Sequence, residues 1–175
     1  GEHTIYSSGH RNPQGLFFSE KKEVIFSTEH GPSGGDELNL ILENKNYGWP
    51  CKTHGILYDY KSNENISEPW PANIESCKNI EFQPPVFSWT PSIAISQGIE
   101  YIGDEFEYFN NDLILGSLKG ASLFRVILDN KNIIRNIEKI HINERVRDII
   151  KLNDGRILVY TDSGNILIIS NNKNK

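Results

Sequence analysis

The sequence NDLILGSLKGASLFRVIL at residues 111–128 contains two apolar runs separated by a lysine-glycine turn. Two further segments repeat this pattern: EVIFSTEHGPSGGDELNLIL at residues 23–42 and GRILVYTDSGNILIIS at residues 155–170. Short apolar runs bounded by turn residues predict antiparallel β-strands, and no segment keeps a helical apolar period over three turns. We therefore expect an all-β protein built from one repeated hairpin.

The spacing of the three hairpins predicts the architecture. Val24, Leu113 and Ile157 begin equivalent apolar runs that are 89 and 44 residues apart. A period of about 40–45 residues is typical of four-stranded β-propeller blades. Residues 44–79 hold three prolines and both cysteines with little alternation, so the longer gap indicates one blade plus an insertion. We expect a β-propeller of four-stranded antiparallel blades, about three of them, in a single domain over residues 1–175, with a long inserted loop at about 44–79 and a frayed tail at 171–175.

Three blades are too few to close a propeller, because closed propellers have roughly 4 to 8 blades. Three explanations stay open: an absent N-terminal half, a second polypeptide that supplies it, or pairing between copies of this chain. Residue 1 is Gly and the chain contains no Met. We therefore expect a processed or trimmed piece, which a signal peptide could have preceded.

The composition excludes several classes of protein. With 37% hydrophobic residues the chain can bury one core, and its net charge of −5 argues against nucleic acid or an anionic membrane as a partner. No apolar run approaches the roughly 18 residues of a membrane-spanning helix. Cys51 and Cys77 lack zinc-site or redox-motif spacing, so a disulfide is favoured over two free thiols and indicates an oxidising compartment.

The segment GHRNPQGLFF at residues 9–18 is the first candidate for a binding site. Because Pro13 does not fit a central strand, Arg11, Asn12 and Gln14 should project from a loop that enters a strand. Such a loop can hold a ligand. The alternative is a polar turn that hydrogen-bonds its own backbone.

The segment STEHGPSGGDELNLI at residues 27–41 is rich in glycine. It lacks the Gly-Lys-Ser/Thr ending of a P-loop and the Gly-x-Gly-x-x-Gly spacing of a dinucleotide-binding loop. A glycine-proline turn presents carbonyl oxygens, and calcium takes such oxygens together with carboxylates. Gly31, Pro32, Asp36 and Glu37 are therefore candidate calcium ligands. The alternative is a hairpin turn with two solvated acids.

Three cations follow in the later repeats. Lys119 lies at the turn of the second hairpin, and Arg145 and Arg147 are two residues apart. On a strand such a pair faces one side, about 6.5 to 7 Å apart, and suits an anion. Glu144 and Asp148 could instead neutralise it. Equivalent turns of a propeller converge on one mouth, where these cations and the arginine of the first motif would suit a polycarboxylate.

Trp89, in FSWTPSIAIS at residues 87–96, could offer a platform to a sugar or a flat ligand, or could be a core residue. The five histidines have no metal-ligand spacing, and no Gly-x-Ser-x-Gly motif indicates a serine hydrolase.

These motifs together resemble the C-terminal half of the soluble pyrroloquinoline-quinone-dependent (PQQ-dependent) sugar dehydrogenases, the glucose/sorbosone or aldose sugar dehydrogenase family of six-bladed β-propellers. The resemblance runs nearly end to end. It rests on GHRNPQGL, EHGPSGGDELNLI followed by NYGWP, WTPSIA, NDLILGSLKG, and RVRDI followed by DGRILVYTDSGNIL, in the family's order.

The resemblance implies an enzyme that oxidises the anomeric hydroxyl of an aldose by hydride transfer to a calcium-bound quinone. It implies these roles: Arg11 stabilises developing negative charge and Asn12 binds the cofactor, Ser92 contacts the cofactor, and Lys119, Arg145 and Arg147 hold the carboxylates of the quinone. It further implies that Gly31 and Pro32 give carbonyls to calcium, that Asp36 and Glu37 lie where some members bind further calcium, and that Trp89 lies near the sugar-stacking tryptophan.

In this family the histidine base belongs to the N-terminal blades, so no residue of this chain is a candidate for it. We expect the chain alone to be inactive, its partners to be an aldose and either the missing blades or further copies of itself, and its location to be periplasmic or secreted. The alternatives are a non-catalytic extracellular propeller that binds a partner and, less favoured, a calcium-dependent propeller hydrolase, which needs an acidic cluster that these motifs lack.

Overall fold

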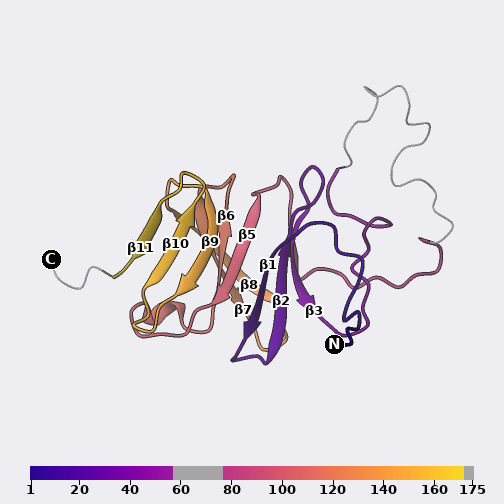
Figure 1. Cartoon of the computed structure of the whole chain (residues 1–175), viewed down its shortest axis with the longest axis horizontal. Helices are drawn as coiled ribbons and strands as arrows, with labels where there is room; N and C mark the ends of the chain where they lie inside the picture. Colours follow the sequence, from indigo (N-terminus) through magenta and orange to yellow (C-terminus); the bar gives the residue numbers. More distant parts are fainter. Residues whose placement is uncertain (57–76, 172–175) are drawn as a thin grey trace, which may run out of the picture.

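The chain folds into three antiparallel β-sheets that stack side by side (Figure 1). The computed structural model describes residues 1–56 and 77–171. The first sheet contains β1 (Pro13–Ser19), β2 (Val24–Glu29), β3 (Asp36–Ile41) and β4 (Phe87–Trp89); the second contains β5 (Ile95–Glu100), β6 (Leu113–Ser117), β7 (Ser122–Leu128) and β8 (Ile134–His141); the third contains β9 (Val146–Lys151), β10 (Ile157–Thr161) and β11 (Ile166–Ile169). A short 3-10 helix, η3 (Glu107–Phe109), precedes β6.

The predicted all-β fold and the predicted repeat are both confirmed. The three hairpins of the sequence are β2–β3, β6–β7 and β10–β11, and Val24, Leu113 and Ile157 each begin the second strand of a sheet. Strands within each sheet pair in chain order, as in the blades of a propeller. The third sheet departs from the expectation of four strands, because it has three within the residues that the structure describes.

Side chains that alternate along the strands form two cores, one on each side of the second sheet. Leu115 of β6 packs in a cluster with Phe26 and Leu38 of the first sheet. Its neighbour Ile114 packs in a second cluster with Ile149 of the third sheet. Successive residues of a strand point to opposite faces, so β6 contributes to both cores. Each such fully buried side chain stabilises the fold by roughly 1.5–3 kcal/mol.

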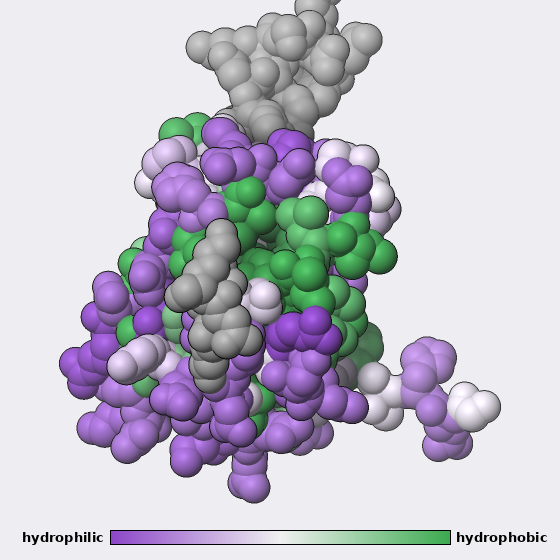
Figure 2. Space-filling view, turned by 90° about the vertical axis from the view of Figure 1, so that its left-hand side faces the viewer, coloured by the Kyte–Doolittle hydropathy of each residue, from purple (hydrophilic) through white to green (hydrophobic). Residues whose placement is uncertain are grey.

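The outer faces of the first and third sheets expose apolar side chains. On the third sheet these are Ile150, Tyr160, Ile166 and Ile168, of which Ile166 is 70% exposed. Figure 2 shows apolar residues gathered at this end of the molecule. On the first sheet Leu16 and Phe18 are exposed on β1. Exposed apolar side chains on the two outermost sheets are what a propeller of about three blades predicts, because its terminal blades lack a neighbour. None of the described helices is long and apolar enough to cross a membrane.

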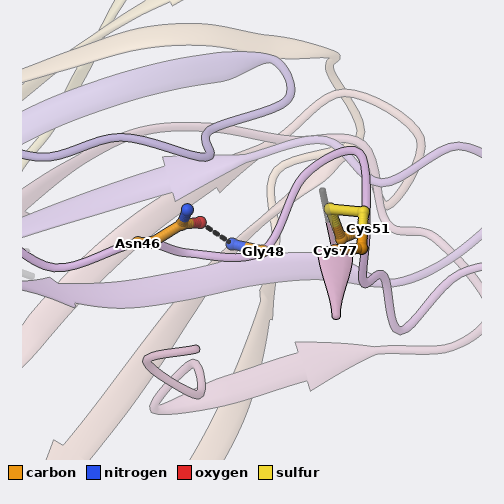
Figure 3. The surroundings of a disulfide bond; sticks show 4 residues. All are labelled: Asn46, Gly48, Cys51 and Cys77. Atoms are coloured by element: carbon orange, nitrogen blue, oxygen red, sulfur yellow. Dashed lines mark hydrogen bonds between the residues drawn. A yellow bond between two sulfur atoms is a disulfide. The ribbon is translucent and has the colours of Figure 1, made fainter. Parts of the chain in front are cut away.

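The connection between β3 and β4 carries the predicted disulfide. Cys51 and Cys77 are bonded, with their Cα atoms 5.5 Å apart and a sequence separation of 26 (Figure 3). Close to Cys51, the side chain of Asn46 accepts a hydrogen bond from the backbone N–H of Gly48 at 2.8 Å. The structure describes only the two ends of the predicted 44–79 loop, because residues 57–76 lie outside the described part.

The first residue of the predicted tail at 171–175 is held by hydrogen bonds. Asn171 donates hydrogen bonds to Glu105 from its backbone N–H at 2.6 Å and from its side chain at 3.2 Å. Residues 172–175 lie outside the described part of the chain.

The antiparallel order of the strands brings alternate connections to one edge of the molecule. The first strands β1, β5 and β9 begin at this edge, which is the upper edge in Figure 1. We call this edge the rim. It comprises residues 9–12, 30–35, 90–94, 118–121, 142–145 and 162–165.

Candidate functional site

All the site residues that the sequence predicts lie on the rim or within two residues of it. They come from every sheet and span most of the chain. They are Arg11, Asn12, Gly31, Pro32, Asp36, Glu37, Trp89, Ser92, Lys119, Arg145 and Arg147. The fold therefore gathers at one edge residues that are up to 136 positions apart, as their residue numbers show.

Arg11 is held against the turn that follows β2. Its Nη1 donates to the carbonyl oxygens of His30 at 3.0 Å and Gly31 at 2.9 Å. Its guanidinium carbon lies 5.1 Å from the centre of the Trp49 ring, which reaches the rim from the β3–β4 connection. Asn12 is fixed beside it, because its carbonyl accepts the His30 N–H at 3.0 Å. The side chain of Asn12 accepts a hydrogen bond from Gln14 at 2.9 Å, a local contact of the kind that the polar-turn alternative expects.

The carbonyl of Gly31 is one of the predicted calcium ligands, and the guanidinium of Arg11 occupies one side of it. A carbonyl oxygen has two lone pairs, so a second partner can still approach it. A Cβ atom at position 31 would overlap the carbonyl oxygen of Gly34, so this close turn requires glycine. The small pocket here has a volume of about 10 Å³, room for about one water molecule or ion, and its lining includes Arg11, Glu29 and Trp49. Calcium binding by Gly31 and Pro32 stays a prediction.

Asp36 is a structural anchor of the rim. It is 1% exposed, and its carboxylate accepts hydrogen bonds from the Ser92 hydroxyl at 2.7 Å, from the Ile95 N–H at 3.2 Å and from the Gly31 N–H at 3.3 Å. The alternative of a solvated acid is wrong for Asp36. These contacts join the first sheet to the strand that begins the second.

Glu37 lies beside Asp36 and faces the other side of the strand. It accepts hydrogen bonds from the ring of His54 at 3.0 Å and from the side chain of Asn39 at 3.1 Å. Within residues 1–56 and 77–171, no three His, Cys, Asp or Glu side chains form a group that could hold a metal ion. A calcium site at Asp36 and Glu37 therefore stays a prediction.

Backbone hydrogen bonds continue along the rim from the second sheet to the third. The carbonyl of Ile93, next to Ser92, accepts the Lys119 N–H at 3.0 Å. The carbonyl of Ala121, in the same turn as Lys119, accepts the Asn143 N–H at 3.0 Å. The Lys119 side chain is exposed and forms no ion pair within the part of the chain that the structure describes.

Arg145 and Arg147 face one side, as their spacing predicts, and share the carboxylate of Asp162. Arg145 Nε donates to one oxygen of Asp162 at 2.8 Å, and Arg147 Nε donates to the other at 2.6 Å. The two hydrogen bonds, first that of Arg145 and then that of Arg147, hold the pKa of Asp162 below its usual value. The guanidinium side chains stay 53% and 47% exposed. The two arginines share this one carboxylate, so a further anion can still approach their exposed N–H groups.

Glu144 and Asp148, the acids of the alternative in which the arginine pair is neutralised, form hydrogen bonds elsewhere. Glu144 accepts a hydrogen bond from Ser163 at 3.0 Å, and Asp148 accepts the N–H of Ile149 at 2.8 Å. Trp89 also differs from its predicted role. It is 8% exposed, and its ring packs edge-on against Phe87 at 4.8 Å and Phe124 at 6.4 Å. A ring this buried offers little surface to a sugar, so the structure favours the core alternative.

Sequence reasoning missed Glu29, Trp49 and Asp162. Glu29 ends β2 and is buried, although a charged residue at a strand end is usually solvated. Trp49 comes from NYGWP, which served only as a family motif. Asp162 binds the arginines in space but lies 15 or more positions from them in sequence. A signal for Asp162 was available in the repeat. Lys119 at the turn of the second hairpin was assigned to the site, and Asp162 lies at the equivalent turn of the third hairpin.

Comparisons with known proteins agree on one family. The family model for glucose/sorbosone dehydrogenases matches residues 1–169. The aldose sugar dehydrogenase YliI of Escherichia coli is 35% identical over 169 residues, which are 95% of this chain and 43% of that protein. The quinoprotein glucose dehydrogenase B of Acinetobacter calcoaceticus is 30% identical over 210 aligned positions, covering 93% of this chain and 44% of that protein.

Solved structures confirm the partial propeller. A crystal structure of a glucose dehydrogenase superimposes with a TM-score of 0.78 at 34% identity and covers 94% of this chain and 45% of that one. The chain thus spans less than half the length of these three relatives.

Proposed function

This chain belongs to the glucose/sorbosone dehydrogenase family, and on that premise we propose that it is the part of a sugar dehydrogenase that holds a calcium-bound PQQ cofactor. The observation that carries the proposal is the rim itself. Contacts that run from Arg11 through Asp36, Ser92 and Lys119 to Arg145 bring four cations to one edge. One relative carries the word quinoprotein in its name, which supports the same cofactor.

The charges of the rim fit a polycarboxylate. Arg145, Arg147 and Lys119 carry three positive charges against the two negative charges of Asp162 and Glu144, so this part of the rim keeps one positive charge in surplus. Arginine in particular suits carboxylates, because its N–H groups match their geometry. These three residues would hold the carboxylates of the quinone, and Asp162 would keep the two guanidinium groups oriented.

The opposite part of the rim would hold the reacting end. When bound, PQQ supplies the acceptor for a hydride from the anomeric hydroxyl of an aldose. Arg11, already fixed by Gly31 and Trp49, would stabilise developing negative charge there, and Asn12 would bind the cofactor. Gly31 and Pro32 would give their carbonyls to calcium, with Asp36 and Glu37 as nearby acids. Ser92 would act through its bond to Asp36 as well as by cofactor contact.

The remaining parts of the active site would come from further blades. None of the described residues is proposed as the base that accepts the proton of the sugar hydroxyl. The exposed apolar faces of β1 and of the third sheet would pack against those blades or, in their absence, against other copies of the chain. The disulfide between Cys51 and Cys77 supports a periplasmic or secreted location.

A titration with PQQ and calcium tests the proposal, with quinone absorbance and protein melting temperature as readouts. The test variant is Arg145→Ala/Arg147→Ala. The matched control is Arg135→Ala/Arg156→Ala, which also removes two exposed, ion-paired arginines but at the edge opposite the rim. We expect calcium-dependent binding that the test variant loses and the control keeps.

Two results would contradict the proposal. Equal loss in both double variants would show that binding follows net charge alone. Absence of binding by the unmodified protein at high micromolar quinone would instead favour a propeller that binds a protein partner without catalysis.

A further inference from the structure

Glu29, the last residue of β2, is a buried carboxylate surrounded by hydrogen-bond donors. It is 3% exposed. Its oxygens accept hydrogen bonds from the Arg11 N–H at 2.8 Å, from the His10 ring at 3.1 Å and from the Asn39 side chain at 2.6 Å. These donors come from the loop before β1 and from β3, so one carboxylate joins three segments.

The segment that Glu29 holds is the one that carries Arg11 and Asn12. Arg11 is fixed from two sides: its backbone N–H by the carboxylate of Glu29, and its guanidinium by the carbonyls of the turn that follows Glu29. The ring of His10 is held further by stacking on Tyr47, with ring centres 4.6 Å apart, and by a hydrogen bond with the Ser7 hydroxyl at 2.9 Å. The carboxylate thus fixes the position of the backbone at Arg11 and the orientation of the His10 ring.

The position of Glu29 is unfavourable for the sheet by itself. Glu29 and Glu37 are paired across β2 and β3, and like charges directly opposite each other repel. Asn39 lies between them, fully buried, and donates one hydrogen bond to each carboxylate. A carboxylate is needed at position 29 because all its neighbours donate. A glutamine would turn an NH2 group toward at least one donor.

We infer that Glu29 is a positioning residue for Arg11 and Asn12, acting through the backbone of the 10–12 loop. The inference rests on the proposed function for its consequence in cofactor binding, and on the structure alone for its effect on the loop. Glu29 would act on the cofactor only through this loop, without contacting cofactor or substrate itself.

The test compares Glu29→Gln with Glu100→Gln. Glu100 is a matched control because it is also a buried carboxylate at a strand end, but at the edge opposite the rim. It accepts hydrogen bonds from the Ser19 hydroxyl at 2.6 Å and from the Lys21 N–H at 3.1 Å. Both variants should lower the melting temperature. Only Glu29→Gln should weaken binding of PQQ with calcium, by about tenfold or more, the change that corresponds to the loss of one such hydrogen bond.

Amide hydrogen exchange gives a second readout that needs no ligand. In Glu29→Gln the Arg11 amide should exchange at least about tenfold faster while the Lys21 amide is unchanged, and Glu100→Gln should show the reverse. If the unmodified protein does not bind the quinone, the proposed function fails and the exchange data still decide whether Glu29 positions the loop. Unchanged exchange at Arg11, or affinities of the two variants within about twofold of each other, would overturn the inference.

A milder variant covers the case in which Glu29→Gln does not fold. His10→Phe keeps a ring on Tyr47 and removes the hydrogen bonds of the ring with Glu29 and with Ser7. It should speed exchange at Arg11 and weaken quinone binding by roughly threefold, because the other two donors remain. Exchange at Arg11 equal to that of the unmodified protein would count against the inference.

Discussion

The carboxylate of Asp36 accepts a hydrogen bond from the hydroxyl of Ser92, 56 residues further along the chain, at 2.7 Å. This contact fastens the turn that carries Gly31 to the loop that enters the second sheet. Two residues proposed for a binding role are therefore also part of the framework of the rim. Their substitution affects stability as well as any ligand.

Replacing Asp36 should cost more stability than replacing Ser92. Asp36→Ala leaves three donors without this acceptor, that of Ile95 buried and those of Gly31 and Ser92 half-buried, and we expect it to lower the free energy of unfolding by about 3 kcal/mol. Ser92→Ala removes one donor and should cost about 1 kcal/mol. Urea denaturation of both variants checks this, and equal costs would mean that the Ser92 bond dominates.

Glycines at equivalent turns should differ in their tolerance of alanine. Gly35 and Gly164 have φ angles of +69° and +83° in the first and third hairpins. A Cβ at Gly35 would overlap the backbone N of Gly55, whereas a Cβ at Gly164 would meet nothing within 4 Å. Gly164→Ala should cost about 1 kcal/mol from its backbone conformation alone. Gly35→Ala should cost at least about twice that, or displace residues 53–56; thermal melts that coincide for the two variants would contradict this.

Removal of the disulfide should destabilise the chain and loosen the base of the inserted loop. Closing a loop of 26 residues stabilises a fold by about 3 kcal/mol on the chain-entropy view. That base includes Ile56, which exchanges backbone hydrogen bonds with Ser33 of the rim. We expect Cys51→Ser/Cys77→Ser to melt at lower temperature and to exchange the Ser33 amide faster. A reductant should change the melting temperature of the unmodified protein but not that of the double variant.

Asp162 should give the rim a defined response to acid. The arginine pair lowers the pKa of its carboxyl below the usual 3.8 in the folded state. A depressed pKa contributes stability that is present above the unfolded value near 3.8 and is lost as the pH falls through the folded value. Arg147→Ala should therefore raise the pKa of Asp162, measured by NMR of the carboxyl carbon. An unchanged pKa would mean that Arg145 alone accounts for the shift.

The isolated chain should associate with itself. The exposed side chains of Ile166 and Ile168 belong to an apolar face that no other sheet of residues 1–56 and 77–171 covers. We expect sedimentation or light scattering to show dimers or larger species, and Ile166→Lys/Ile168→Lys to shift them toward monomer. A stable monomer of 20.0 kDa for the unmodified chain would refute this expectation.

Much of the fold follows from the order of residues because its causes are local. Alternation of apolar side chains places β2, β6 and β10, and the repeat length identifies the blades, since both depend on neighbours within one hairpin. The disulfide follows because Cys51 and Cys77 are the only cysteines. The shared direction of Arg145 and Arg147 follows from the two-residue period of a strand.

The partners of the rim residues were decided by contacts between segments that are distant in the sequence. That Asp162 and not Glu144 or Asp148 binds the arginines depends on how β10 pairs with β9. Trp89 could equally have been a platform or a core residue until the second sheet covered its ring. Burial of Glu29 and Asp36 likewise required loops to close over them. The ion-pair partners and the burial of these residues depend on what packs against each side chain, and the local sequence pattern does not show that.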